Sequence, residues 1–151
     1  MTSAPEAAAG QDWPRALRAA GRRVTRQRLT VLDVAHATPH ATAEMILADA
    51  RSALPSLTPQ SVYQVLADLS EIGLLRKLQT PGAPARYETR IGDNHHHVMC
   101  IRCGRVDDVD CVIGEAPCLV PGDTAGMRIV AADVLFRGIC AACEANAGAE
   151  H

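Results

Sequence analysis

The chain has 151 residues, which is enough for one domain or for two small ones. Hydrophobic residues make up 48% of it but aromatic residues only 3%, so its core must consist mainly of Ala, Val, Leu and Ile. A net charge of −2 argues against strong nonspecific binding of nucleic acid, and no apolar run is long enough to span a membrane. Residues 1–10 lack the basic and then apolar pattern of a signal peptide, so we expect a cytoplasmic protein that does not bind membranes.

Charge is distributed unevenly along the chain. Residues 1–90 contain eleven Lys and Arg against eight Asp and Glu, whereas residues 91–151 contain four against nine. Six arginines and no acidic residue lie between Trp13 and Leu32, namely Arg15, Arg18, Arg22, Arg23, Arg26 and Arg28. This run predicts a positive face suited to phosphate, and an ordinary solvated helix surface is the alternative.

Residues 1–54 predict three helices after a disordered N-terminus at 1–11. The first helix is expected over 13–20, because Gly21 follows it as a stop signal. Thr25 is expected to cap a second helix that ends near Ala37, and Thr42 a third that ends near Leu54, before Pro55. On the third helix the apolar pattern predicts a buried side made of Met45, Ile46, Ala50 and Leu54.

The clearest helix start in the chain is Thr58-Pro59, because Thr is a favoured cap and Pro is favoured at the first helical position. Val62, Val65, Leu66 and Leu69 then repeat with the helical period and are expected to point inward. This leaves an outward face consisting of Ser61, Tyr63, Gln64 and Asp68. The fourth helix therefore predicts a polar surface on a well-capped, amphipathic element.

The segments 73–79 and 85–89 look extended and are separated by a turn rich in Pro and Gly. Helices followed by such a hairpin predict a winged helix-turn-helix domain over residues 12–87. A helix of this kind reads bases in the major groove, where a tyrosine contacts a thymine methyl and an amide pairs with base edges. We therefore expect DNA contacts from Arg22, Arg23, Arg26, Ser61, Tyr63 and Gln64, although Tyr63 packing on the hairpin and Gln64 as a solvated bystander are alternatives.

A polar stretch at 88–94 predicts a hinge, followed by a second domain at 95–146 and a disordered tail at 147–151. Strands are expected at 98–101 and 105–110 around a turn, with further strand character over 127–139. Cys140 is expected to begin a short helical segment. Any helix within 112–126 must be short, because that stretch contains three Gly and two Pro.

Two Cys-x-x-Cys pairs, Cys100/Cys103 and Cys140/Cys143, have the spacing that lets one turn aim two sulfurs at a single ion. Four thiolates satisfy tetrahedral zinc and leave no open position, so the predicted site is structural. Two redox pairs or buried unligated thiols are the alternatives. Cys111 and Cys118 are left over, either as small buried residues or as a redox pair.

Together these segments resemble the Fur family of metal-dependent transcriptional repressors, from about Arg15 to Cys143. The resemblance lies in Arg23-Val24-Thr25-Arg26-Gln27-Arg28, Ser61-Val62-Tyr63-Gln64-Val65-Leu66, Gly73-Leu74-Leu75, Arg86-Tyr87-Glu88 and the segment His95 to Gly104. The run from Asp93 through Cys111, with Gly114-Glu115-Ala116-Pro117-Cys118-Leu119, is most similar to the actinobacterial FurA/CatR group, whose members are associated with catalase-peroxidase.

The resemblance implies an α+β protein, with a winged helix-turn-helix followed by a small α/β dimerisation domain that contains a four-cysteine zinc site. It also implies a regulatory metal, with the matching positions His40, Glu88, His95, His97 and Asp108. Imidazole and carboxylate ligands suit Fe²⁺, Mn²⁺ or Zn²⁺. Strand alternation sends His96 to the opposite face from its neighbours, which makes it a candidate ligand for a second, weaker metal.

The resulting hypothesis is a homodimeric, redox-responsive repressor that binds an inverted-repeat operator of oxidative-stress genes when its regulatory metal is present. A zinc- or iron-uptake regulator of the same family is the alternative, because peroxide sensors commonly have Asp where this chain has Glu88. No enzyme and no small-molecule substrate are expected. The chain has no His-Glu-x-x-His motif, and neither Cys-x-x-Cys pair opens a helix within a βαβ unit.

Overall fold

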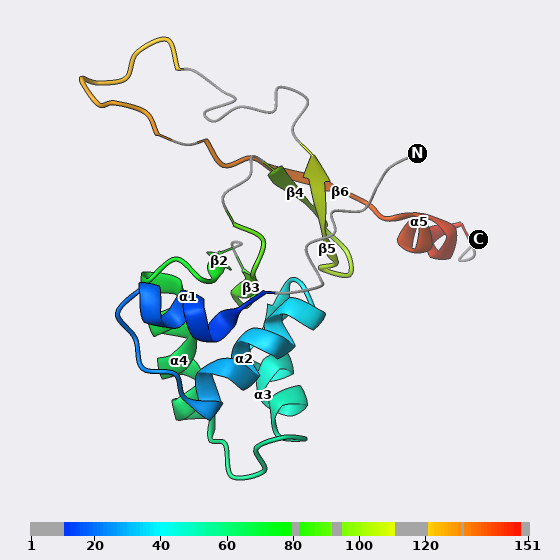
Figure 1. The fold of residues 1–151 in the computed structure, drawn as a ribbon. Helices are drawn as coiled ribbons and strands as arrows, with labels where there is room; N and C mark the ends of the chain where they lie inside the picture. The colour runs from blue at the N-terminus through cyan, green and yellow to red at the C-terminus, as the bar shows by residue number, and fades with distance from the viewer. Residues whose placement is uncertain (1–10, 80–81, 92–94, 111–120, 131, 149–151) are drawn as a thin grey trace, which may run out of the picture. The chain divides into compact units, whose positions relative to one another are not determined.

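The computed structural model describes residues 11–79, 82–91, 95–110, 121–130 and 132–148. The chain forms two compact units, which divide between Ile91 and Gly92 (Figure 1). We call them the N-terminal unit and the C-terminal unit. Disorder is predicted at 1–11 and 147–151, and of these segments residues 1–10 and 149–151 lie outside the described residues. Most of the stretch between Val112 and Gly126, with both Cys111 and Cys118, also lies outside them.

Within residues 11–79 and 82–91, the N-terminal unit forms four helices and a three-stranded antiparallel sheet (Figure 1). In chain order its elements are α1 (Trp13–Ala19), α2 (Arg26–Ala37), β1 (Ala41–Thr42), α3 (Ala43–Ala50), α4 (Pro59–Glu71), β2 (Arg76–Leu78) and β3 (Arg86–Glu88). The central strand is β3, and β1 and β2 pair with it on either side. The predicted winged helix-turn-helix is confirmed, with β2 and β3 as the wing.

Helix starts in this unit follow the sequence closely. Thr25, Thr42 and Thr58 each accept a hydrogen bond on the side-chain oxygen from the backbone N–H three residues later. Each cap satisfies one of the amide donors that a helix start otherwise leaves unpaired. Pro59 occupies the first position of α4, where its missing N–H costs nothing.

Helix α3 differs from its prediction in two respects. It ends at Ala50 rather than near Leu54. The N–H groups of residues 52 and 53 donate to the carbonyls three residues back, which is the bonding of a tighter turn than an α-helix. In addition, the residue before a proline disfavours the helical conformation. Met45 was predicted to be buried, but its side chain is 45% exposed. Ala43, Ile46 and Ala50 form the buried stripe instead, and Met45 lies one residue outside it.

The core of the N-terminal unit fixes the orientation of α4. Val62, Leu66 and Leu69 are buried against apolar residues of the other helices, which include Leu17, Val31, Leu32 and Ile46. Val65 is partly buried against the same cluster. Because one face of α4 is held in this way, its opposite face is presented to solvent as a rigid surface.

The described residues of the C-terminal unit form a three-stranded mixed sheet and one helix. Its elements are β4 (His95–Cys100), β5 (Val106–Asp110), β6 (Leu135–Gly138) and α5 (Ala141–Ala147). Strand β4 is central, antiparallel to β5 and parallel to β6. It begins three residues earlier than predicted, β6 covers only part of 127–139, and α5 includes Ala147, the first residue of the expected tail.

The described residues of the C-terminal unit bury little apolar surface. Among its described residues, the buried hydrophobic side chains are Cys100 and Val106. Larger apolar side chains are exposed, namely Ile101, Met127, Val130, Phe136 and Ile139. The described part of this unit has little core of its own, so bound metal or a partner surface would add stability. In the part of the chain that the structure describes, no helix has the length and apolar character needed to cross a membrane.

Candidate metal centres and nucleic-acid interface

Cys100, Cys103, Cys140 and Cys143 come together at one end of the C-terminal sheet, and their sulfur atoms all lie within 4.8 Å of one another. The sulfurs of Cys103 and Cys140 are 3.8 Å apart. Zinc–sulfur bonds of about 2.3 Å at tetrahedral angles require sulfur–sulfur distances of about 3.8 Å. The four predicted ligands therefore fit a tetrahedral Zn²⁺ that stabilises the fold and has no open coordination position.

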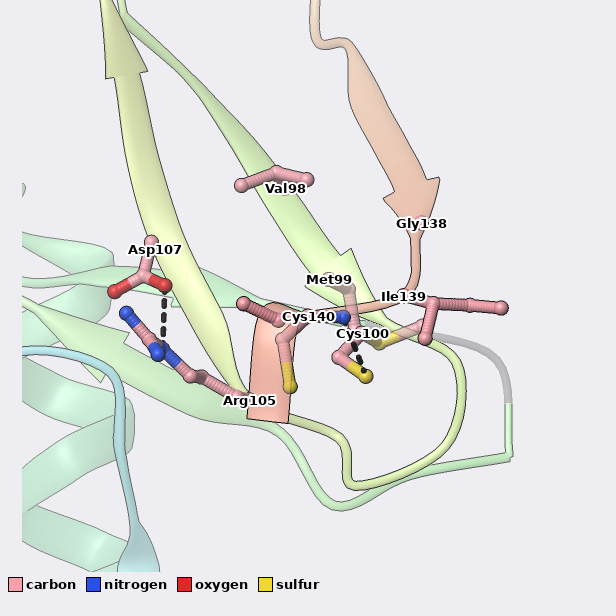
Figure 2. A pocket seen from close by; sticks show the side chains of 9 residues that line it. Val98, Met99, Cys100, Arg105, Asp107, Gly138, Ile139 and Cys140 are labelled. Carbon is pink, nitrogen blue, oxygen red and sulfur yellow. Dashed lines mark hydrogen bonds and ion pairs between the residues drawn. The ribbon is translucent and has the colours of Figure 1, made fainter. Parts of the chain in front are cut away.

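The backbone around Cys100 prepares this site. Cys100 ends β4, and its carbonyl accepts a hydrogen bond from the N–H of Gly104, which takes a positive φ of 77° in the turn before β5. The N–H of Cys140, just before α5, donates to the Cys100 sulfur over 3.4 Å (Figure 2). Hydrogen bonds from the backbone of Cys103 and Cys140 lower the pKa of Cys100 to about 6. This sulfur is thus readily present as the thiolate that binds metal.

Cys143 has the opposite tendency. Its thiol proton is shared mainly with Cys140, and this raises the pKa of Cys143 to about 12. Zinc binding would have to displace that proton, so the cluster couples metal affinity to proton release. Arg102 donates a hydrogen bond to the Cys143 carbonyl in α5 over 3.4 Å.

Two predicted regulatory ligands lie in the N-terminal unit. His40 Nε2 and Glu88 Oε2 are 3.1 Å apart, and both side chains are buried. Neighbouring donors bound to one ion at roughly 2.0–2.2 Å lie about 3.0–3.5 Å apart, so this spacing fits a shared metal as well as a hydrogen bond. Arg76 lies near the same carboxylate, with 4.0 Å between Nη1 and Glu88 Oε1.

His40 adopts a backbone conformation that is rare outside glycine, with φ of +63°. Two hydrogen bonds to β3 hold His40 in this conformation. The His40 N–H donates to the Tyr87 carbonyl over 3.0 Å, and Arg86 Nη1 donates to the His40 carbonyl over 2.8 Å. Strained residues of this kind persist where the surroundings fix them, often at binding sites. Nothing in the local sequence signalled this strain or the role of Arg86.

Three more predicted ligands lie in the C-terminal unit. Asp108 Oδ1 is 3.2 Å from His97 Nε2 and 3.5 Å from His95 Nε2, and the two imidazole rings are 4.9 Å apart. His97 and Asp108 face each other directly across β4 and β5. The predicted alternation along β4 therefore brings His95 and His97 to one carboxylate. His96 lies between them, is also buried, and pairs with Val109 in the strand register.

The outer face of α4 carries the predicted base-reading residues. Tyr63 is 54% exposed, and Gln64 is exposed beside it. Ser61 is partly exposed, and its hydroxyl shares a hydrogen bond of 2.9 Å with the Thr58 cap. Tyr63 also lines a cavity of about 130 Å³ against the wing residues Pro84 and Ala85. Tyr63 thus lies beside the hairpin and is also exposed to solvent.

The predicted phosphate-binding arginines differ in their surroundings. Arg23 is exposed, and so is Arg26, which donates to the Ala53 carbonyl over 3.4 Å. Arg22 is instead held at 2.7 Å by Asp68 on α4, a residue that the helical pattern had assigned to the outward face. Sequence patterns on two separate elements do not reveal such a pairing.

Comparison with known proteins matches residues 19–116 to the ferric uptake regulator family. The chain belongs to this family. It is 48% identical over 132 residues to the transcriptional regulator FurA of Mycobacterium tuberculosis, which covers 87% of this chain and 90% of the relative. The resemblance of this ferric uptake regulator family member to the actinobacterial FurA group is thereby confirmed. Its relatives are transcriptional regulators and not enzymes.

Solved structures of ferric uptake regulators share the fold. The Vibrio cholerae regulator has a TM-score of 0.66 at 22% identity, covering 85% of this chain and all of the other. The Helicobacter pylori regulator has a TM-score of 0.67 at 19% identity, covering 87% and 89% of the two chains, and is described as having three functional metal-binding sites. The α+β architecture predicted for this family member agrees with both.

Proposed function

We propose that this ferric uptake regulator family member is a metal-dependent, redox-responsive repressor that acts in the cytoplasm on oxidative-stress genes of the catalase-peroxidase type. The identity with the mycobacterial FurA over most of both chains supports the subgroup. One observation carries the mechanism: each unit contains an incomplete set of metal ligands, all of them buried except Asp108, whose side chain is 25% exposed. The N-terminal unit contributes His40 and Glu88, and the C-terminal unit contributes His95, His97 and Asp108.

An ion that takes ligands from both sets would couple the two units. Fe²⁺ or Mn²⁺ prefers more ligands than either set supplies, and imidazole with carboxylate suits these ions and Zn²⁺. Binding would then restrict the relative motion of the DNA-reading unit, which is a closure switch driven by the ion. Loss of the ion would release that restraint and lower the affinity for DNA.

The partner of the switch is double-stranded DNA. In a homodimer the two α4 helices are related by twofold symmetry, so the operator is an inverted repeat. Tyr63 and Gln64 would contact base edges, while Arg23 and Arg26 would bind phosphates that flank them. No small-molecule substrate enters this scheme.

Metal content and operator binding measured on the same samples, before and after peroxide, test this proposal. A redox-responsive repressor should lose the regulatory metal, or oxidise a ligand, and lose operator binding together. The measurement should be made with Fe²⁺ and with Mn²⁺, since only Fe²⁺ reacts readily with peroxide. If peroxide changes neither binding nor ligand mass in the Fe²⁺ form, the redox proposal is wrong.

A zinc- or iron-uptake regulator is the second candidate, and Glu88 favours it, because peroxide sensors of this family commonly have Asp at that position. In that case the metal acts only as a co-repressor. Chelation would then abolish operator binding, while peroxide would leave it intact. Expression of the target genes in cells limited for iron or for zinc would further show which of the two metals is the co-repressor, because limitation of that metal should derepress the genes.

Replacing Tyr63 with alanine should weaken operator binding by about 1–3 kcal/mol and leave binding to mixed-sequence DNA nearly unchanged, if the ring contacts a base. Fluorescence anisotropy on both DNAs measures the difference. Tyr63→Phe is the matched control, since it keeps the ring and should retain most of the affinity. Equal losses on both DNAs would instead make Tyr63 a packing residue of the wing.

A further inference from the structure

Asp68 joins α4 to two arginines that come from other parts of the N-terminal unit. Its Oδ1 is 2.7 Å from Arg22 Nε, in the segment between α1 and α2. Its Oδ2 is 3.2 Å from both Nε and Nη2 of Arg28, in the first turn of α2. All three side chains are between 23% and 33% exposed, so this is a partly buried cluster and not a loose surface contact.

The cluster extends to the main chain of the basic segment. Arg28 Nη1 donates to the Arg23 carbonyl over 2.8 Å while the same guanidinium binds Asp68. Different nitrogens of the planar guanidinium hold the two partners, and the single ammonium nitrogen of lysine does not reproduce this geometry. Arg28 therefore connects α4 to the backbone of Arg23, and we call this connection a strut. It leaves few N–H groups of Arg28 for DNA.

This strut crosses a gap in the packing. On the outer side, between the start of α2 and α4, lies a cavity of about 340 Å³ lined by Thr25, Gln27, Arg28, Gln64, Val65 and Asp68. The ion pairs of Asp68 connect α2 and α4 beside this hollow, in addition to the apolar contacts that the two helices share in the core. Gln64 lies one helical turn before Asp68 on the same face of α4.

We propose that Asp68 is a positioning residue that fixes the phosphate-binding segment 22–26 against α4 and thereby sets how well the protein distinguishes its operator from other DNA. The proposal rests on the proposed function, in which α4 reads bases. Operator binding needs base contacts and phosphate contacts in one register, whereas binding to mixed-sequence DNA accepts any register. Loss of the connection should therefore affect the operator more.

Asp68→Asn keeps the shape of the side chain but removes its charge. Titrations with the Mn²⁺-loaded full-length protein would use two probes: a duplex selected from a randomised pool by the wild-type protein, and sonicated mixed-sequence DNA. We expect operator affinity to fall by about eightfold at 0.1 M salt for each phosphate contact that loses its register. Affinity for mixed-sequence DNA should stay equal or rise, because Arg22 is released.

Two further variants separate position from charge. Glu71→Gln removes one negative charge from the same helix, but Glu71 is 77% exposed and 4.0 Å from Arg22, so both DNAs should bind slightly more tightly and the preference should not change. Arg28→Lys keeps the positive charge but cannot bridge Asp68 and the Arg23 carbonyl, so it should reproduce the loss of preference. Thermal melts of each variant verify that the fold is intact.

The outcomes are distinct. An equal gain on both DNAs, as for Glu71→Gln, would reduce Asp68 to a charge effect and overturn the proposal. An equal loss on both would make its role purely structural and would overturn it as well. If the wild-type protein itself selects no duplex from the pool, the proposed function is wrong. If the wild-type protein is selective and Asp68→Asn has the same ratio of operator affinity to mixed-sequence affinity, only the positioning role is wrong.

Discussion

Replacing Cys143 with serine should release zinc and unfold the C-terminal unit, while the four helices of the N-terminal unit stay folded. The four sulfurs satisfy a tetrahedral ion together, and three of them leave it with an open position. Structural zinc contributes on the order of 10 kcal/mol or more to small domains. The described residues of this unit bury few apolar side chains that could compensate.

The measurement pairs zinc content by mass spectrometry with an NMR spectrum that reports each unit separately. Signals from α1–α4 should persist, and those from β4 to β6 should collapse toward random-coil positions. Cys118→Ser is the matched control, because the four-sulfur set is complete without that residue. A Cys143→Ser protein that retains a full equivalent of zinc and a folded sheet would contradict the assignment.

Replacing His97 with alanine should leave the cysteine-bound zinc in place but abolish the dependence of operator binding on added Mn²⁺. His97 Nε2 lies 3.2 Å from the carboxylate of Asp108, so its removal takes one proposed ligand and the partner that orients another. Loss of an outer partner alone typically costs 10–100-fold in metal affinity, so loss of a ligand should cost at least about that much.

The readout is Mn²⁺ titration followed by gel shift on the operator. His96→Ala is the control from the same strand, because His96 pairs with Val109 and alternation turns it to the other side of the sheet. It should keep most of the metal dependence and should weaken only a second, looser site. Unchanged Mn²⁺ dependence in His97→Ala would remove this residue from the switch.

Much of the local structure could be predicted from the sequence, because its signals act over a few residues. Thr25, Thr42 and Thr58 cap helices as expected. Each cap bond joins a threonine oxygen to the amide three residues later, so it can form without contacts to distant segments. The four cysteines come together as predicted, because the two-residue spacing within each pair directs both sulfurs to the same point. Alternation along β4 likewise placed His95 and His97 on one side.

Other features depended on contacts between distant segments. Met45 looked buried because its neighbours are apolar, yet α3 has a buried stripe too narrow to include it. The strand predicted over 127–139 shortened to β6, since pairing with β4 extends only over its last part. The positive φ of His40 results from bonds to Tyr87 and Arg86, which lie far away in the sequence.

Strand β4 carries proposed ligands of both metals, with His95 and His97 near one end and Cys100 at the other. A slip of one residue in its pairing would turn every one of these side chains to the opposite face. The turn through Gly104 and the hydrogen bond from Cys140 to the Cys100 sulfur hold the register at the cysteine end. We therefore expect the two metals to load in sequence, zinc before the regulatory ion. Starvation for zinc would consequently leave newly made protein unresponsive to iron or manganese, whatever the supply of either.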